Sequence, residues 1–175
     1  MCNRKFKRRN IMYKFRIATE SEADEAYRKY SYGGEHIYGV GGEEVYALFL
    51  GKVITLFGKP DNLSDDWECM YSIDVTAEDE NGNKLVLEVY HGPGGPSIST
   101  PIKLEGAEAE LYEKTAKELV KYIESAEPAD YEWESVYYDI PVNVKYTVKD
   151  GKAGVDSEFE EDFDMDEDFD PEELM

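Results

Sequence analysis

Carboxylates are the side chains whose number and spacing first suggest chemistry in this chain. The last twenty residues, 156–175, contain twelve acidic residues and no basic one, and their centre reads FEEDFDMDEDFD. Four aspartates there repeat every second residue, as at the start of a calcium-binding loop: Asp164, Asp166, Asp168 and Asp170. An EF-hand loop also needs Gly at its sixth position and Glu at its twelfth, where this chain has Phe169 and Met175. We therefore expect no specific metal site and no cofactor.

The two histidines, His36 and His91, both lie in glycine-rich stretches. Neither has a second histidine or a cysteine at the spacing of zinc ligands, so each is predicted to be a surface residue. Cys69 and His91 could meet across a hairpin, but the sequence supplies no third group to orient them as nucleophile and base. We predict that the chain is not an enzyme. A small hydrolase or ligand-binding domain around His91 and Cys69 is the alternative.

Net charge narrows the class of partner. The chain has 175 residues, with 40 Asp and Glu, 19 Lys and Arg, and a net charge of −21. Such a charge opposes binding of DNA, RNA or an anionic membrane through the body of the protein, and it favours a basic partner. The alternative is that the negative charge serves only to keep the protein soluble. The first sixteen residues reverse the sign, with seven Lys or Arg and no acid, and this basic arm could contact nucleic acid or the acidic tail.

The cysteine count and the hydropathy pattern indicate a cytoplasmic protein. Two cysteines, Cys2 and Cys69, do not make a disulfide framework, which fits a reducing cytosol. The basic start is not followed by the apolar run of a secretory signal. No stretch approaches the roughly 20 apolar residues of a membrane span, so we expect no membrane contact.

Three helices are indicated by caps and apolar stripes. Thr19 and Glu22 form a capping box after a strand at 12–18, and Gly33 and Gly34 are predicted to end that helix. An apolar stripe predicts a second helix over 43–57, although the β-branched residues at 52–57 also allow a strand. The third helix is expected over 106–126, with an apolar seam made of Leu111, Thr115, Leu119 and Ile123.

Strands are indicated by alternation and turn signals. Residues 67–77 and 84–91 alternate and are joined by DENGN, which predicts a hairpin. The stretch HGPGGPSISTP, residues 91–101, is predicted to be a loop. Residues 131–155 indicate two strands and a short return, with a tight turn at Asp150-Gly151. We predict an α+β fold with an antiparallel sheet of about four to six strands and two or three helices. The organisation is a basic arm at 1–11, a single domain at 12–155 and an acidic disordered tail at 156–175.

Acids without a base nearby in the sequence can stand in for phosphates. One such run, 61–80, includes Asp65, Asp66 and Glu68; another lies between Lys121 and Lys145 and includes Asp130, Glu132, Glu134 and Asp139. In DYEWESVYY the acids alternate with aromatic residues, so a strand would put Asp130, Glu132 and Glu134 on one face. Residues on one face repeat at about 6.6 Å, close to every second phosphate of a DNA strand at about 3.4 Å each. A half-exposed strand without this role would show the same alternation.

The tail combines acids with aromatic residues. Phe163 and Phe169 lie among Asp164, Asp166 and Asp168, a pattern typical of disordered interaction segments. We predict that these residues dock on a basic, partly apolar groove of a partner. A solvated tail is the alternative.

In size, charge and an α+β core with acidic strands, the chain resembles two kinds of small bacterial or phage proteins. One kind is the acidic inhibitors that block nucleic-acid enzymes, including anti-CRISPR and other anti-defence proteins. The other is the immunity proteins that neutralise toxins, often nucleases. No family motif carries the resemblance, so it transfers no residue roles. It implies a non-enzymatic inhibitor whose carboxylates bind a basic, nucleic-acid-binding protein; an immunity protein, or an assembly protein of a mobile element, is the alternative.

Overall fold

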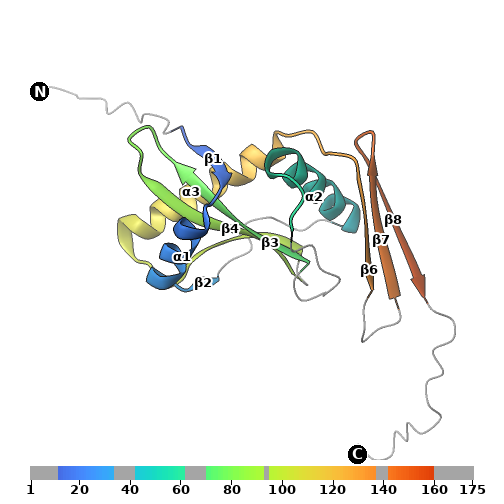
Figure 1. Cartoon of the computed structure of the whole chain (residues 1–175), viewed down its shortest axis with the longest axis horizontal. Helices are drawn as coiled ribbons and strands as arrows, with labels where there is room; N and C mark the ends of the chain where they lie inside the picture. The colour runs from blue at the N-terminus through green and yellow to red at the C-terminus, as the bar shows by residue number, and fades with distance from the viewer. Residues whose placement is uncertain (1–11, 34–41, 62–69, 93–94, 137–141, 160–175) are drawn as a thin grey trace, which may run out of the picture.

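The computed structural model describes residues 12–33, 42–61, 70–92, 95–136 and 142–159. These residues form three helices and eight strands, and the strands divide between two antiparallel sheets (Figure 1). The predicted α+β class is confirmed, and the larger sheet has five strands, within the predicted range. The second sheet, with three strands, is an addition to the one predicted.

The larger sheet has the strand order β1-β3-β4-β5-β2. Its members are β1 (Lys14–Ile17), β2 (Tyr32–Gly33), β3 (Tyr71–Glu78), β4 (Lys84–Gly92) and β5 (Gly95–Pro101). Alternation turns one face into the core, with buried side chains that include Tyr71, Val75, Leu87, Val89 and Ile98. The predicted turn between β3 and β4 is confirmed. There the Asp79 carboxylate accepts hydrogen bonds from the backbone N–H groups of Asn81 and Asn83, at 2.8 and 2.9 Å.

The prediction of a loop over 91–101 is wrong, because residues 95–101 form strand β5. Its glycines and prolines favour a loop, but the chain pairs with β4 from Glu88↔Ser99 to Gly92↔Gly95. Pro96 and Pro101 lie near the two ends of the strand, where a missing N–H disrupts the ladder least. Pairing with a long neighbouring strand therefore outweighs the local preference for a turn.

Helix α1 (Glu20–Lys29) covers part of the polar face of the larger sheet. Its predicted capping box is confirmed: the Glu22 N–H donates to Thr19 Oγ1 at 3.2 Å, and the Thr19 N–H donates to Glu22 Oε2 at 3.0 Å. The helix ends earlier than the predicted stop at Gly33, because Tyr30 is extended and its N–H donates to the Ala26 carbonyl. Gly33 instead belongs to β2, opposite Thr100.

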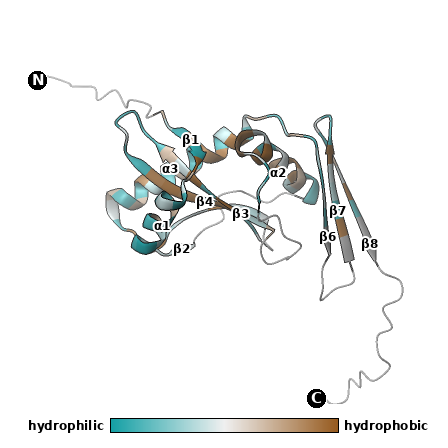
Figure 2. Cartoon of the chain, in the orientation of Figure 1, coloured by the Kyte–Doolittle hydropathy of each residue, from teal (hydrophilic) through white to brown (hydrophobic). Residues whose placement is uncertain are grey.

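Helix α2 (Glu43–Phe57) is apolar on most of its circumference and lies between the two sheets (Figure 1). A helix of this kind must be buried on several sides, and Ala47, Phe49, Leu50 and Val53 are almost fully buried. The alternative of a strand over 52–57 is wrong, since the helix continues to Phe57. Figure 2 shows hydrophobic residues along α2 and on β4 and β7.

Helix α3 (Gly106–Glu124) is confirmed, with a correction to its apolar seam. Thr115, Leu119 and Ile123 are buried as predicted, but Leu111 is 38% exposed. Tyr112 and Ala116 complete the buried face, so the contact surface is rotated slightly away from Leu111.

The smaller sheet is the meander β6 (Tyr131–Val136), β7 (Val142–Lys149) and β8 (Lys152–Phe159). Its apolar face packs on α2, where the Tyr131 hydroxyl donates to the Ala47 carbonyl at 2.7 Å. Trp133 stacks on Tyr146, with ring centroids 5.4 Å apart. Strand β8 includes the first four residues of the segment predicted as the tail; residues 160–175 lie outside the described residues.

Candidate protein-binding surface

The acid row on β6 has the orientation that the sequence predicts. Trp133 is 9% exposed and faces α2, whereas Glu132 and Glu134 are exposed on the other face. Asp130, directly before the strand, is also exposed. The packed aromatic residues fix the strand, so the carboxylates project from a stable support.

The premise that this row has no basic neighbour is wrong. Lys145 on β7 is the register partner of Glu134, and its Nζ lies 3.7 Å from Glu132 Oε2. Asp130 accepts a hydrogen bond from the Asp150 N–H at 2.9 Å. Lys145 bounds the acidic run in the sequence and was therefore not counted as a neighbour of the row. Antiparallel pairing of β6 and β7 brings it alongside Glu132 and Glu134. Exposed ion pairs of this kind contribute little energy, so the row is weakened as an anionic surface without being neutralised.

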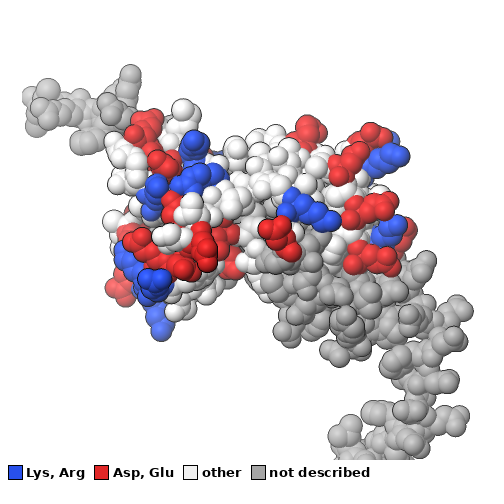
Figure 3. Space-filling view, in the orientation of Figure 1, with Lys and Arg blue, Asp and Glu red and all other residues white. Residues whose placement is uncertain are grey.

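Figure 3 shows acidic and basic side chains interleaved over the smaller sheet. Over the described residues as a whole, 25 Asp and Glu stand against 14 Lys and Arg, a net charge of −11. The folded part is therefore acidic in its own right, but its charge is mixed locally.

Three of the acids of the run 61–80 that the structure describes are engaged: Asp74, Glu78 and Asp79. Glu78 lies 3.8 Å from Arg16, and Asp79 closes the β3–β4 turn. Asp74 accepts a hydrogen bond from the Tyr27 hydroxyl at 2.5 Å. Asp61 is exposed at the end of the segment that follows α2. The other predicted partner-binding residues lie outside the described residues: Asp65, Asp66, Glu68, Asp139, Phe163, Asp164, Asp166, Asp168 and Phe169.

The prediction that His91 is a surface residue is wrong, because it is 4% exposed. Its ring packs edge-on against Tyr46 and Tyr71, at centroid distances of 5.5 and 5.6 Å. Its Nδ1 has no hydrogen-bond partner within the part of the chain that the structure describes. Burial lowers the pKa of His91 to about 4, so the imidazole is neutral at pH 7. The glycines around it suggested a loop, but Gly92 ends β4 and Gly95 begins β5, where it lies against Tyr46 of α2.

Cys69, the other residue of the hydrolase alternative, lies outside the described residues. The next residue, Met70, is described, and its N–H donates to the His91 carbonyl at 2.8 Å. A histidine as buried as His91 meets a substrate only if the surrounding residues open. The alternative remains a prediction, and the described geometry adds no oriented base to it.

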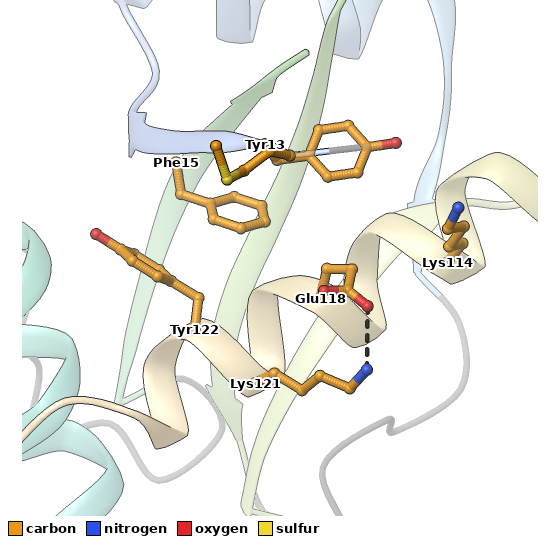
Figure 4. A pocket seen from close by; sticks show the side chains of 7 residues that line it. Tyr13, Phe15, Lys114, Glu118, Lys121 and Tyr122 are labelled. Atoms are coloured by element: carbon orange, nitrogen blue, oxygen red, sulfur yellow. Dashed lines mark hydrogen bonds and ion pairs between the residues drawn. The ribbon is translucent and has the colours of Figure 1, made fainter. Parts of the chain in front are cut away.

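Among the described residues, two of the surface grooves that join segments distant in sequence contain several apolar side chains. The first lies between β1 and α3 and has a volume of about 490 Å³ (Figure 4). Tyr13 and Phe15 face Tyr122 across it, and Phe15 and Tyr122 have ring centroids 5.2 Å apart. At its edge Lys121 Nζ lies 3.0 Å from Glu118 Oε1, so one of its two lysines is already paired.

The second groove lies between α1, β3 and the end of α2, with a volume of about 560 Å³. We call it the acidic groove. Apolar and acidic side chains line it together: Ile17, Ala23, Phe57 and Ile73, with Glu20, Asp24, Asp61 and Asp74. The sequence analysis did not identify it, because its acids come from three separate segments and only the fold brings them together. The feature of the sequence that could have indicated the groove is the cluster of acids in the first turns of α1.

No group of three or more His, Cys, Asp or Glu side chains suited to a metal ion occurs in the described ranges. None of the described helices is long and apolar enough to cross a membrane. Comparison with protein-family models finds no match, and comparisons with curated proteins and with solved structures find none either.

Proposed function

We propose that the protein is a non-enzymatic inhibitor that binds a basic, nucleic-acid-binding protein by presenting carboxylates in place of phosphates. The observation that carries the proposal is the acid row Asp130, Glu132 and Glu134, held outward by a strand whose other face is anchored on α2. The charge of −21 supports it, since a basic groove attracts such a surface over a long range. An inhibitor of the anti-CRISPR or anti-defence type, acting in the cytosol, fits these features best.

The physical basis is substitution of one anion array for another. A protein that binds DNA or RNA gains much of its affinity from lysine and arginine contacts to phosphates. Carboxylates at about 6.6 Å along a strand can engage the same side chains. Lys145 competes for Glu132, but an exposed pair is exchanged at low cost.

The test is affinity capture from nuclease-treated lysate at low salt, followed by binding measurements with the captured protein. We expect a nucleic-acid-handling partner that DNA or RNA displaces. The variant Asp130→Lys/Glu132→Lys/Glu134→Lys should lower affinity at least tenfold, about 1.4 kcal/mol.

The matched control is Glu25→Lys/Glu110→Lys/Glu113→Lys, which makes the same change of net charge at exposed positions outside the run that contains the acid row. We expect it to weaken binding by less than threefold at 150 mM salt. Unchanged binding by the β6 variant would exclude the acid row as a contact surface for the partner. A partner that nucleic acid does not displace would exclude mimicry and favour an immunity protein.

A further inference from the structure

We propose that the acidic groove is a docking site for a basic segment of the partner protein, in which an apolar side chain is flanked by Lys or Arg. The inference rests on the proposed function in one respect, namely that the partner is a basic protein. It goes further by assigning a second contact surface, on the larger sheet, and by specifying the chemistry that fits it.

The first observation is apolar exposure inside the groove. Ile17 is 45% exposed and Tyr27 is 43% exposed, and both line the groove. Phe57 and Ile73 lie beside them, half-buried. An apolar surface in a concavity gains free energy when another apolar side chain removes it from water, about 25 cal/mol per Å².

The second observation is charge. Glu20, Asp24, Asp61 and Asp74 line the groove, against one base among its lining residues, Lys59. Glu20 has a structural explanation, since acids in the first turn stabilise a helix N-terminus. Asp24 and Asp61 have none of that kind: Asp24 makes a loose, exposed ion pair with Arg28 at 3.8 Å, and Asp61 lies in the segment that follows α2. Their placement is complementary to a cationic occupant.

The third observation is that hydrogen bonds within the chain hold the α1 and β3 walls of the groove together. Arg16 holds Glu22 of α1 with two hydrogen bonds of 2.7 Å, which fasten α1 to β1. The Ala18 N–H donates to the Asp74 carbonyl at 2.8 Å, and the Tyr27 hydroxyl donates to the Asp74 carboxylate. A preformed groove avoids much of the entropy cost of ordering at an interface.

The experiment titrates the full chain with two fluorescein-labelled hexapeptides of equal charge, RLRRLR and RSRRSR, at 150 mM NaCl, and follows anisotropy. We expect the leucine peptide to bind at least fivefold tighter than the serine peptide. The variant Asp24→Asn/Asp61→Asn should bind the leucine peptide at least fivefold more weakly. Ile17→Thr, which keeps a β-branched residue at the exposed end of β1, should remove most of the preference for leucine over serine.

The matched control is Glu110→Gln/Glu113→Gln on α3, which removes the same charge outside the groove and should change binding less than twofold. Equal binding of the two peptides would overturn the proposal. Equal weakening by the groove and α3 variants would also overturn it, because general attraction to an acidic protein would then explain the binding.

The two proposals fail in different ways. If the two peptides bind equally, but nucleic acid still displaces the captured partner and the β6 variant still binds it weakly, the groove proposal is overturned. The inhibitor proposal then remains intact. If the β6 variant still binds the leucine peptide selectively, the groove proposal is supported even if nucleic acid displaces no partner. In that case only the proposal of nucleic-acid mimicry is overturned.

Discussion

Glu22 shows how much one side chain contributes to this fold. Its carboxylate accepts two hydrogen bonds of 2.7 Å from Arg16, one of 3.0 Å from the Thr76 hydroxyl and one of 3.0 Å from the Thr19 N–H. Lys84 Nζ lies 3.0 Å away. The Arg16 hydrogen bonds in particular hold the pKa of Glu22 well below its usual range. One residue therefore caps α1, fastens it to β1 and joins it to β3 and β4.

Replacing Glu22 tests this role. Glu22→Gln keeps the size of the side chain but removes the charge, and we expect the free energy of unfolding to fall by about 1–3 kcal/mol. Urea unfolding followed by circular dichroism at pH 7 measures it. The control Glu113→Gln removes an exposed pair with Lys117 and should leave the free energy of unfolding almost unchanged. Equal effects of the two substitutions would contradict the role of Glu22.

His91 gives a prediction about pH. Its pKa is about 4 in the folded protein and about 6.5 in an unfolded chain, so between these values the unfolded state binds more protons. The free energy of unfolding should therefore fall as pH decreases through this window, by about 2 kcal/mol between pH 7 and pH 5. The rings packed against it are those of Tyr46 and Tyr71.

Substitution isolates the contribution of His91 from other acid effects. His91→Phe should lose the decrease in the free energy of unfolding between pH 7 and pH 5, whatever its stability at pH 7. His36→Gln, which removes the other histidine, should retain it. The low pKa of Glu22 also makes stability fall with decreasing pH, but in a lower range: its contribution is present above about 4.3 and is lost as pH falls below that. A slope that persists in His91→Phe would show that another group titrates.

At the scale of elements, α2 is the element on which both sheets depend. Gly51 lies in the middle of the helix, where glycine usually weakens a helix by about 1 kcal/mol relative to alanine. Here a Cβ atom would lie 2.8 Å from Pro128 Cβ and 3.2 Å from the Ala129 carbonyl oxygen. The Ala129 N–H donates to the Gly51 carbonyl at 2.9 Å, so the segment between α3 and β6 runs directly against the helix.

Gly51→Ala should therefore destabilise the protein despite the better helix propensity of alanine. We expect a loss of about 1–3 kcal/mol in the free energy of unfolding, since a rigid backbone cannot move aside. Chemical denaturation measures it. Gly154→Ala on β8 is the control, because its Cβ would have no neighbour closer than 3.9 Å. A stabilising effect of Gly51→Ala would show that the segment at 128–129 yields easily.

Elements with a local signal were predictable from the sequence, and those that depend on distant pairing were not. The capping box at Thr19, the turn after β3 and the helix over 43–57 each depend on neighbouring residues, and all three are confirmed. Strand β5 was missed because its stability comes from β4. The acid row had the predicted orientation, but Lys145 entered it across the sheet.

The acidic groove shows the same limit at the level of a site. Asp61 and Asp74 lie in one acidic run of the sequence, but nothing in the sequence spacing relates them to Asp24. Only the docking of α1 on β3 and the return of the chain after α2 bring these side chains together. A sequence reading can identify an excess of acid, whereas the fold decides where it is concentrated.

At the scale of the whole molecule, the net charge of −21 makes two predictions with opposite signs. Like charges repel in the compact state, so salt should stabilise the fold. Between 10 and 150 mM NaCl the screening length falls from about 30 to about 8 Å, and we expect the melting temperature to rise by roughly 2–8 °C, about 1–2 kcal/mol for a chain of this length. Binding to a basic partner should weaken over the same range.

The pH of the measurement separates self-repulsion from general effects of salt. The sequence pI is about 4.4, so at pH 4.5 the net charge is close to zero and the stabilisation by 150 mM NaCl should almost vanish. Scanning fluorimetry at pH 7.5 and pH 4.5, with matched salt series, measures both. An equal rise at the two pH values would mean that salt acts through something other than net charge. A fall in melting temperature with salt at pH 7.5 would mean that the ion pairs of Glu22 and its neighbours outweigh the repulsion. The long-range field proposed to attract a basic partner would then contribute little.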